Sequence, residues 1–189
     1  MTNGIRTRIY ILQVGLIGVF AFCSVLLFAG GSFVHGMITD QLSAQKISFP
    51  AAGSPGLSAT EFPDLQQYAG QPVNDGIKAE AYANGFINRH LQTVAGGLTY
   101  AQMSAKAQAA PTDTKLAGQV NTLFKGEMLR GTLLNTYGWW TVGSYATLAG
   151  IGLAVAAGAV LVALLVEIFL AIKAREVRPL TVPKKAFAS

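Results

Sequence analysis

Two histidines are the residues of this sequence whose chemistry comes closest to that of an enzyme site. A non-haem iron centre uses two histidines and a carboxylate and keeps coordination positions open, and the chain has only His35 and His90. His35 falls at the far end of an apolar run and His90 near the end of a predicted helix, so their spacing does not bring them together. We expect no metal site and no cofactor. We interpret His90 as a helix-end residue that favours the helix dipole and bonds to the following turn.

The sequence also lacks the residue pattern of a nucleophilic active site. The one cysteine, Cys23, lies in the middle of an apolar run, and no serine stands in the Gly-x-Ser-x-Gly pattern of a hydrolase. Glu167 lies six residues before Lys173, and an acid inside a membrane can be functional. The interpretation we favour is that Glu167 lies near a membrane surface and reaches out to it. The chain is therefore predicted not to be an enzyme, since catalysis would need a partner to complete the site.

Two long runs without charge dominate the sequence. No Asp, Glu, Lys or Arg occurs in residues 10–39 or 131–166, and only 12% of the chain is charged. About 20 apolar residues are enough to cross a bilayer as a helix. The sequence predicts an all-α membrane protein with two transmembrane helices, residues 10–36 and 138–172.

Positive charge gathers at the two ends of the chain. Residues 37–137 hold seven basic and seven acidic side chains, so the net charge of +5 comes from the flanks. Lys and Arg are enriched on the cytoplasmic side of membrane helices. Residues 1–9 and the basic tail 173–189 are therefore predicted to be cytoplasmic in a cell-membrane protein, with 37–137 as an extracytoplasmic domain. That domain is neutral, so nucleic-acid binding is not expected. The residues expected at the membrane interfaces are Tyr137, Trp139 and Trp140 on the outer side and Lys173 and Arg175 on the inner side.

The second helix is expected to extend well beyond the membrane. The run 131–166 would by itself make a helix of ~54 Å, against a hydrocarbon core of ~30 Å. Two short spans would fit into it, but no proline interrupts the run and a third span would put the basic tail outside. Apolar residues recur at helical spacing from Leu116, which predicts a helix from about Lys115 with Thr112 as its N-cap. Gly131 and Gly138 are the places where this helix could bend.

Three short helices are predicted within residues 37–137, after a loop rich in proline and glycine. Ser58 and Thr99 each begin the Ser/Thr-x-x-Glu/Gln spacing of a capping box, which marks the start of a helix. The glycine pair at 96–97 ends the middle helix. The predicted helices are residues 64–68, residues 78–94, and a helix from Thr99 that stops before Pro111.

The stretch YAGQPVNDGIKAEAYANGFINRHLQTVAGGLTYAQM, followed by FKGEMLRGTLLNTYGWW, resembles a family of small actinobacterial two-span membrane proteins. In that family an Ala-rich helix ending in a histidine precedes a glycine turn and a Thr-Tyr-Ala-Glu/Gln helix start, and a Leu-Arg-small step leads into the second span. Its members have no assigned function and often carry the label of an aromatic-ring-opening dioxygenase, which two histidines do not support. The matching residues are Ala79, Ala83, Ile87, His90, Gly96, Gly97, Thr99, Tyr100, Ala101, Leu129 and Arg130.

Small residues recur along the second span, and small residues let helices approach closely. They pack either on the chain's own first span, at Gly15 and Gly18, or on a helix of another subunit. We expect a non-catalytic accessory subunit of a larger actinobacterial membrane complex, with a respiratory-chain supercomplex as the first assembly to consider. Its partners would be other membrane-protein subunits and membrane lipids. The alternative is a lipid- or quinone-binding module that holds its ligand in an apolar groove. The helix-packing residues are Gly143, Ala146, Gly150, Ala154 and Gly158.

Overall fold

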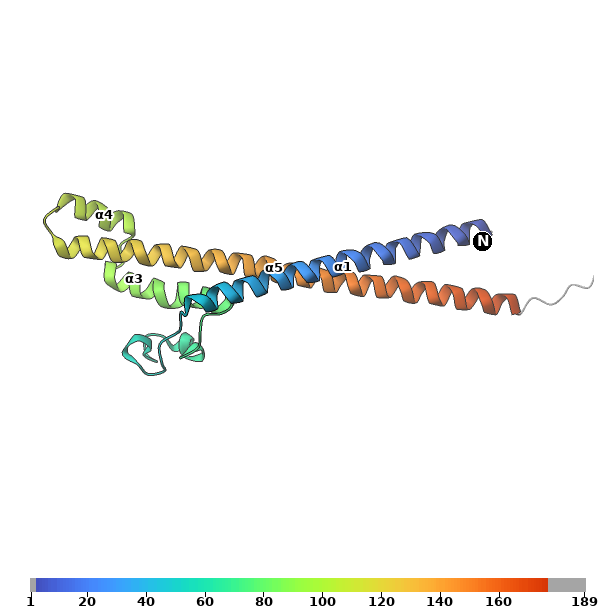
Figure 1. Ribbon diagram of the computed structural model, residues 1–189, viewed down its shortest axis with the longest axis horizontal. Helices are drawn as coiled ribbons and strands as arrows, with labels where there is room; N and C mark the ends of the chain where they lie inside the picture. The colour runs from blue at the N-terminus through green and yellow to red at the C-terminus, as the bar shows by residue number, and fades with distance from the viewer. Residues whose placement is uncertain (1–2, 177–189) are drawn as a thin grey trace, which may run out of the picture. The chain divides into compact units, whose positions relative to one another are not determined.

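The computed structural model describes residues 3–176, and the regular structure of that part of the chain is helical (Figure 1). One isolated antiparallel bridge, Ser48 to Pro72, is its nearest approach to a sheet. The prediction of an all-α chain is confirmed. The elements are α1 (Asn3–Gln45), η1 (Pro55–Leu57), η2 (Pro63–Tyr68), α2 (Gly76–Glu80), η3 (Ala81–Ile87), α3 (Asn88–Ala95), α4 (Tyr100–Ala109) and α5 (Thr114–Glu176).

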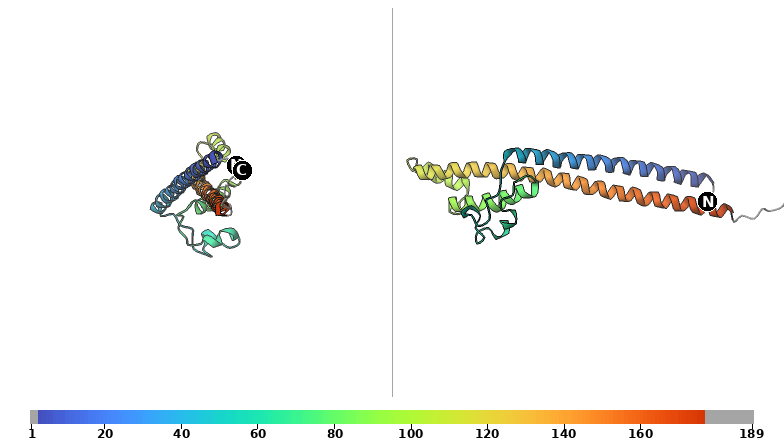
Figure 2. Two further views of the ribbon diagram at one scale, coloured as in Figure 1. Left: turned by 90° about the vertical axis from the view of Figure 1, so that its right-hand side faces the viewer. Right: turned by 60° about the horizontal axis from the view of Figure 1, so that its bottom comes forward.

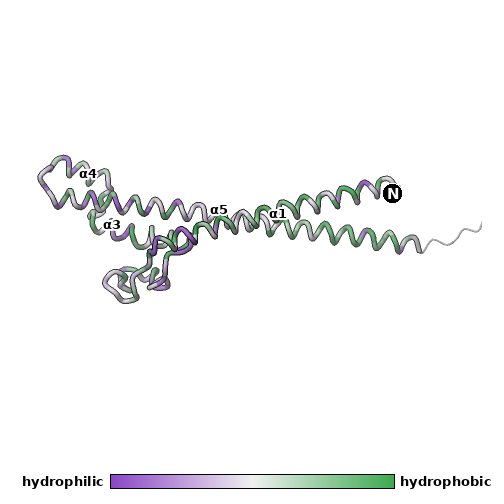
Figure 3. The backbone as a smooth tube through the Cα atoms, in the orientation of Figure 1, coloured by the Kyte–Doolittle hydropathy of each residue, from purple (hydrophilic) through white to green (hydrophobic). Residues whose placement is uncertain are grey.

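Two of these helices are long and apolar enough to cross a membrane. They cover Gly4–Gln45 and Thr114–Ala174, and Figure 3 shows hydrophobic residues along α1 and along the second half of α5, with polar residues gathered between them in the sequence. With 63 residues, α5 is about 95 Å long, roughly three times the ~30 Å core of a bilayer. Both helices are therefore longer than a crossing requires.

The chain divides into two compact units. The first, here called the two-helix unit, comprises Met1–Phe28 and Leu148–Ser189, and the second, here called the compact unit, comprises Ala29–Thr147. Both α1 and α5 contribute to each unit. Turned views of the ribbon show the two helices running alongside each other within each unit (Figure 2).

The α5 helix is unbroken from Thr114 to Glu176, so neither Gly131 nor Gly138 interrupts it. Its N-cap differs from the predicted Thr112. The backbone N–H of Leu116 donates to Oδ1 of Asp113 at 2.9 Å, which makes Asp113 the capping residue. A carboxylate at this position satisfies a free N–H and also faces the positive end of the helix dipole.

The core of the compact unit lies where the short helices meet the two long ones. Figure 1 shows α3 and α4 running alongside the first part of α5. Leu91 of α3 packs on Gly126 of α5, and Gln119 of α5 donates to the carbonyl of Val94 at 2.9 Å. The buried apolar residues are Ile38, Leu42, Phe49, Leu57, Phe62, Leu65, Val73, Ala79, Ala81, Ala83, Ile87, Leu91, Ala95, Met103, Leu123 and Leu133.

The predicted helix over residues 78–94 is a continuous helical segment from Gly76 to Ala95, whose middle part, η3, is a π-helix. Asp75 caps its start by accepting from the N–H of Lys78 at 2.8 Å. It ends where Gly96 adopts a left-handed conformation with φ 59° and Gly97 N–H donates back to the carbonyl of Gln92. The next helix, α4, begins with the predicted capping box between Thr99 and Gln102.

Candidate functional site

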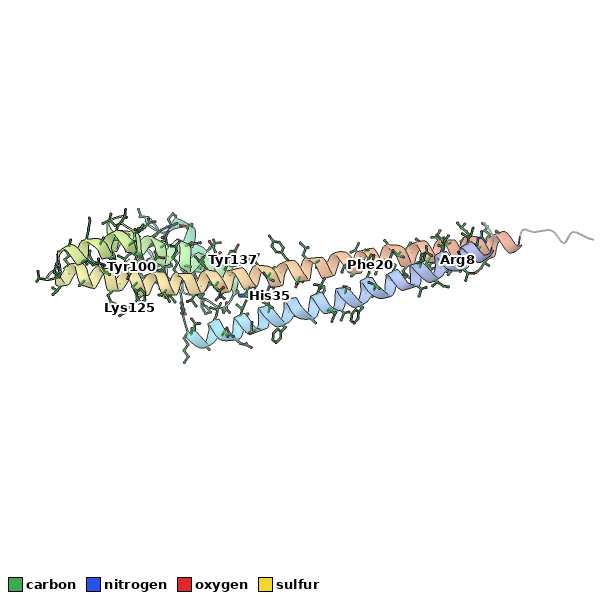
Figure 4. The ribbon with its side chains drawn as sticks, turned by 90° about the horizontal axis from the view of Figure 1, so that it is seen from above. Arg8, Phe20, His35, Tyr100, Lys125 and Tyr137 are labelled. Carbon is green, nitrogen blue, oxygen red and sulfur yellow. The ribbon has the colours of Figure 1, made fainter. Side chains whose placement is uncertain are left out.

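The most specific polar contact between α1 and α5 in the compact unit is made by His35 and Trp140. Their rings stack with centroids 3.9 Å apart and planes inclined by 19°. The Nε2 atom of His35 also lies 3.0 Å from the carbonyl oxygen of Trp140 and 3.2 Å from the hydroxyl of Ser144. Figure 4 shows His35 on the side of α1 that faces α5. We call His35, Trp140 and Ser144 the histidine joint.

Three glycines allow the chain to close around the histidine joint. A Cβ atom on Gly143 would lie 2.9 Å from Cδ2 of His35, and one on Gly31 would lie 2.7 Å from the carbonyl oxygen of Gly143. Gly76, the first residue of α2, lies against the Cβ and Cγ atoms of Trp140. Any larger residue at these positions would push the helices apart, so the joint depends on glycine where the backbones approach most closely.

In the two-helix unit, Ser24 makes the central polar contact. Its hydroxyl donates to the carbonyl oxygen of Gly150 at 2.7 Å, and a Cβ on Gly150 would lie 3.1 Å from the carbonyl oxygen of Ser24. The less exposed positions of both helices alternate in steps of three and four residues, the spacing of a left-handed helix pair. On α1 these positions include Gln13, Ile17, Phe20, Ser24 and Leu27, and on α5 they include Leu153, Ala157, Val160 and Leu164.

Glu167, predicted to reach toward a membrane surface, accepts a hydrogen bond from the side-chain amide of Gln13 at 3.2 Å. The other amide atom, Oε1 of Gln13, is buried and has no hydrogen-bond partner among the described residues. Glu167 is thus tied to α1, with its side chain still exposed.

The five predicted helix-packing residues separate into two groups. Gly143 and Gly150 are buried against α1, and Ala146 between them is half-buried. Ala154 is exposed, and a Cβ on Gly158 would meet nothing within 4 Å. The predicted contacts at Gly15 and Gly18 are absent, because both are also open; residues near Ser24 and Gly31 take their place. For Ala154 and Gly158, packing against another subunit stays a prediction.

The predicted membrane-interface residues occupy different surroundings. Trp139 is exposed and Tyr137 is half-buried, whereas Trp140 is taken up in the histidine joint. Lys173 is exposed. Arg175 lies within α5, but its side chain falls outside the described part of the structure, as do residues 177–189 of the predicted basic tail.

His90 does not form the predicted hydrogen bond to the following turn. It is exposed, and no bond from its ring occurs among the described residues; the two glycines end the helix instead. Its neighbour Arg89 makes the stronger contact, donating from Nη1 and Nη2 to the two carboxylate oxygens of Asp64 at 2.8 Å each. This hydrogen bonding lowers the pKa of Asp64 and raises that of Arg89. The guanidinium also lies 5.6 Å from the ring centre of Phe62, and together these contacts fasten η2 to α3.

Within residues 3–176, no three His, Cys, Asp or Glu side chains lie close enough together to hold a metal ion. Partial burial raises the pKa of Tyr82. Its ring centroid lies 5.0 Å from those of Phe49 and Phe86, and the side chain packs against the core. A half-open hollow of about 350 Å³ lies at the end of α1, lined by both polar and apolar residues that include Leu42, Lys46 and Val73.

Sequence reasoning missed Gln13, Ser24 and His35 as contact residues. Each is a polar side chain in the apolar helix α1, and each bonds to α5 within its own unit. They are spaced eleven residues apart, which is close to three turns and places them on one face of a helix. Polar residues at this spacing in an apolar run were the signal that would have found them.

Comparison of the sequence with models of protein families, with curated proteins and with solved structures finds no match. The resemblance to the actinobacterial two-span family therefore stays a prediction.

Proposed function

We propose that the chain is a non-catalytic subunit of a larger membrane assembly, held to it by the apolar helices. In this proposal residues 10–36 and 138–172 cross the cell membrane, both ends of the chain are cytoplasmic, and residues 37–137 lie outside. The two long apolar helices and the basic flanks support this placement. A respiratory-chain supercomplex remains the first assembly to test.

The observation that carries the proposal is a set of open glycines in the two-helix unit. A Cβ atom added to Gly15, Gly18, Gly152 or Gly158 would meet nothing within 4 Å. Glycine in a helix costs about 1 kcal/mol relative to alanine, and contact between α1 and α5 does not explain these four. In a bilayer, small residues are typical of surfaces where another helix approaches closely. In the proposal, helices of other subunits approach the chain at these positions.

Within the two-helix unit, polar contacts hold α1 against α5. The hydroxyl of Ser24 and the side-chain amide of Gln13 donate hydrogen bonds to groups on α5. These donors are therefore not left unpaired in lipid, where an unpaired polar group is costly. The remaining surface of both apolar segments is exposed and therefore available to lipid and to a partner. Its action would be mechanical, positioning the neutral domain beside the partner.

The test is extraction of the full-length chain from its native membrane in mild detergent, with an affinity tag after Ser189, and mass spectrometry of the co-purifying proteins. Other membrane-protein subunits in a fixed ratio support the proposal. Recovery of the chain with no other protein contradicts it, and a stoichiometric lipid or quinone in that sample favours the ligand-binding alternative.

A matched pair of variants maps the docking surface. Gly158→Leu fills the open position and is expected to reduce co-purification of the partner. Ala149→Leu adds a comparable side chain nine residues earlier, about 180° around the helix from Gly158, and is expected to retain the partner. Because both positions are exposed in the chain, neither change disturbs the packing of α1 on α5.

A further inference from the structure

We infer that two copies of this chain pair in parallel through the outward face of α5 in the compact unit. This face, here called the outward stripe, consists of Phe124, Met128, Gly131, Asn135, Gly138, Val142 and Tyr145. The inference goes beyond the proposed function, since it rests on different residues and names a second copy of the chain as the occupant.

The outward stripe lies opposite the face of α5 that is buried in the core. Leu133 is only 1% exposed, and its neighbours two residues away, Gly131 and Asn135, point about 200° around the helix from it. All seven stripe residues are exposed. The outward face of a helix beside water is normally polar, yet here Met128 is 58% exposed. Phe124, whose ring lies beside that of Tyr100 on α4, is still 50% exposed.

The spacing of the stripe matches a two-stranded coiled coil. Its members follow one another in alternating steps of four and three residues, which is the heptad repeat of helices that pair along a seam. Met128, Asn135 and Val142 then occupy the a positions, and Phe124, Gly131, Gly138 and Tyr145 occupy the d positions. A Cβ added to Gly131 or Gly138 would meet nothing within 4 Å, so the seam has room for another helix to approach closely.

Asn135 indicates which helix fits the seam. Its side chain forms no hydrogen bond among the described residues, although it lies between open glycines on an apolar stripe. A single asparagine at an a position specifies the register and the two-stranded state of parallel coiled coils. A second copy in parallel brings an identical amide to the same level, where one copy donates and the other accepts.

The charges beside the seam allow the parallel arrangement. Two copies crossing one membrane in the same direction have parallel α5 helices. In the heptad register, Lys125 at an e position then faces Val120 of the second copy, and Glu127 at a g position faces Thr132. The pairing therefore places no like charges together, which would otherwise oppose association.

The stripe also presents enough surface for a specific dimer. A half-exposed aromatic ring presents about 100 Å², and the four large residues together present about 400 Å². The two glycines and Asn135 bring the total to about 600 Å² for each copy, or about 1,200 Å² for the pair, which is the lower end of the range for specific protein interfaces.

Cysteine cross-linking in native membranes tests the inference directly. In a full-length chain carrying Cys23→Ala, Gly131→Cys is expected to give a disulfide-linked dimer on mild oxidation, because d positions of paired helices bring Cβ atoms close together. Leu129→Cys is the control, since it is exposed but points about 140° from the stripe. Equal cross-linking at both positions, or none at Gly131→Cys, overturns the inference.

A second pair of variants tests the dimer without oxidation. Met128→Lys places like charges across the seam and is expected to reduce co-purification of two differently tagged copies about tenfold or more, whereas Leu129→Lys is expected to retain it. If both variants still pair, or if both lose pairing, the inference is overturned. A chain that co-purifies with other subunits but not with its own copy would refute this dimer and leave the proposed function standing.

Discussion

Replacing Gly76 with alanine tests whether the histidine joint is as tightly packed as the structure shows. A Cβ at this position would overlap the Cβ and Cγ atoms of Trp140 and lie 2.9 Å from its Cδ1. These atoms form the root of the side chain and cannot swing aside, and the ring is already stacked on His35. The backbone of α2 must therefore move. Overpacking of this kind costs about 2–3 kcal/mol of folding free energy. The higher helix propensity of alanine offsets little of this cost, because Gly76 is the first residue of its helix.

Thermal unfolding in mild detergent, followed by tryptophan fluorescence, measures this cost. For a unit the size of residues 29–147, each kcal/mol corresponds to about 4 °C, so Gly76→Ala is expected to lower the Tm by about 8 °C or more. Gly118→Ala is the matched control, because its Cβ would meet nothing within 4 Å and alanine favours the α5 helix by up to about 1 kcal/mol. If the Tm of the Gly76→Ala chain equals that of the wild type, the close packing of α2 on Trp140 is refuted.

Three further variants test individual contacts by the same melting measurement. Ser24→Ala removes the hydrogen bond to the α5 backbone and is expected to weaken the pairing of the two apolar segments by about 0.6–1.7 kcal/mol; an unchanged Tm would contradict it. Thr99→Ala removes the capping box of α4 and should cost about 1 kcal/mol, whereas Ser104→Ala, inside α4, serves as the control and should leave the cap intact. Arg89→Ala should cost at most about 1 kcal/mol at pH 7 because its pair with Asp64 is exposed. Since Arg89 lowers the pKa of Asp64, that contribution is present above about pH 4 and is lost as the pH falls through the lowered pKa, so an Arg89→Ala penalty that grows in acid would contradict the assignment.

Features encoded by neighbouring residues could be predicted from the sequence. The capping box at Thr99 and the glycine end of α3 each depend on a few adjacent positions, and both appear as expected. The length of α5 also followed, because no proline or charge interrupts its apolar run. The N-cap of that helix was assigned one residue too early, since Thr112 and Asp113 both carry suitable oxygens and only the backbone conformation decides between them.

Contacts between distant residues could not be predicted in the same way. His35 and Ser144 are 109 positions apart, and their contact depends on the register of α1 against α5. The predicted helix-packing residues of α5 show how the outcome depends on this register. Steps of four residues turn a helix by about 40° more than a full turn, so the steps from Gly150 to Ala154 and Gly158 rotate away from α1, while the seven-residue step from Gly143 to Gly150 stays on it.

The native mass of the untagged protein, extracted from its own membrane in mild detergent, shows whether the chain is a subunit of a larger assembly. The chain has a mass of 19.9 kDa. A subunit of a larger assembly is expected in a particle that contains other polypeptides and is far heavier than two copies of the chain with its detergent. A particle that contains only one or two copies of the chain would contradict its role as a subunit of a larger assembly.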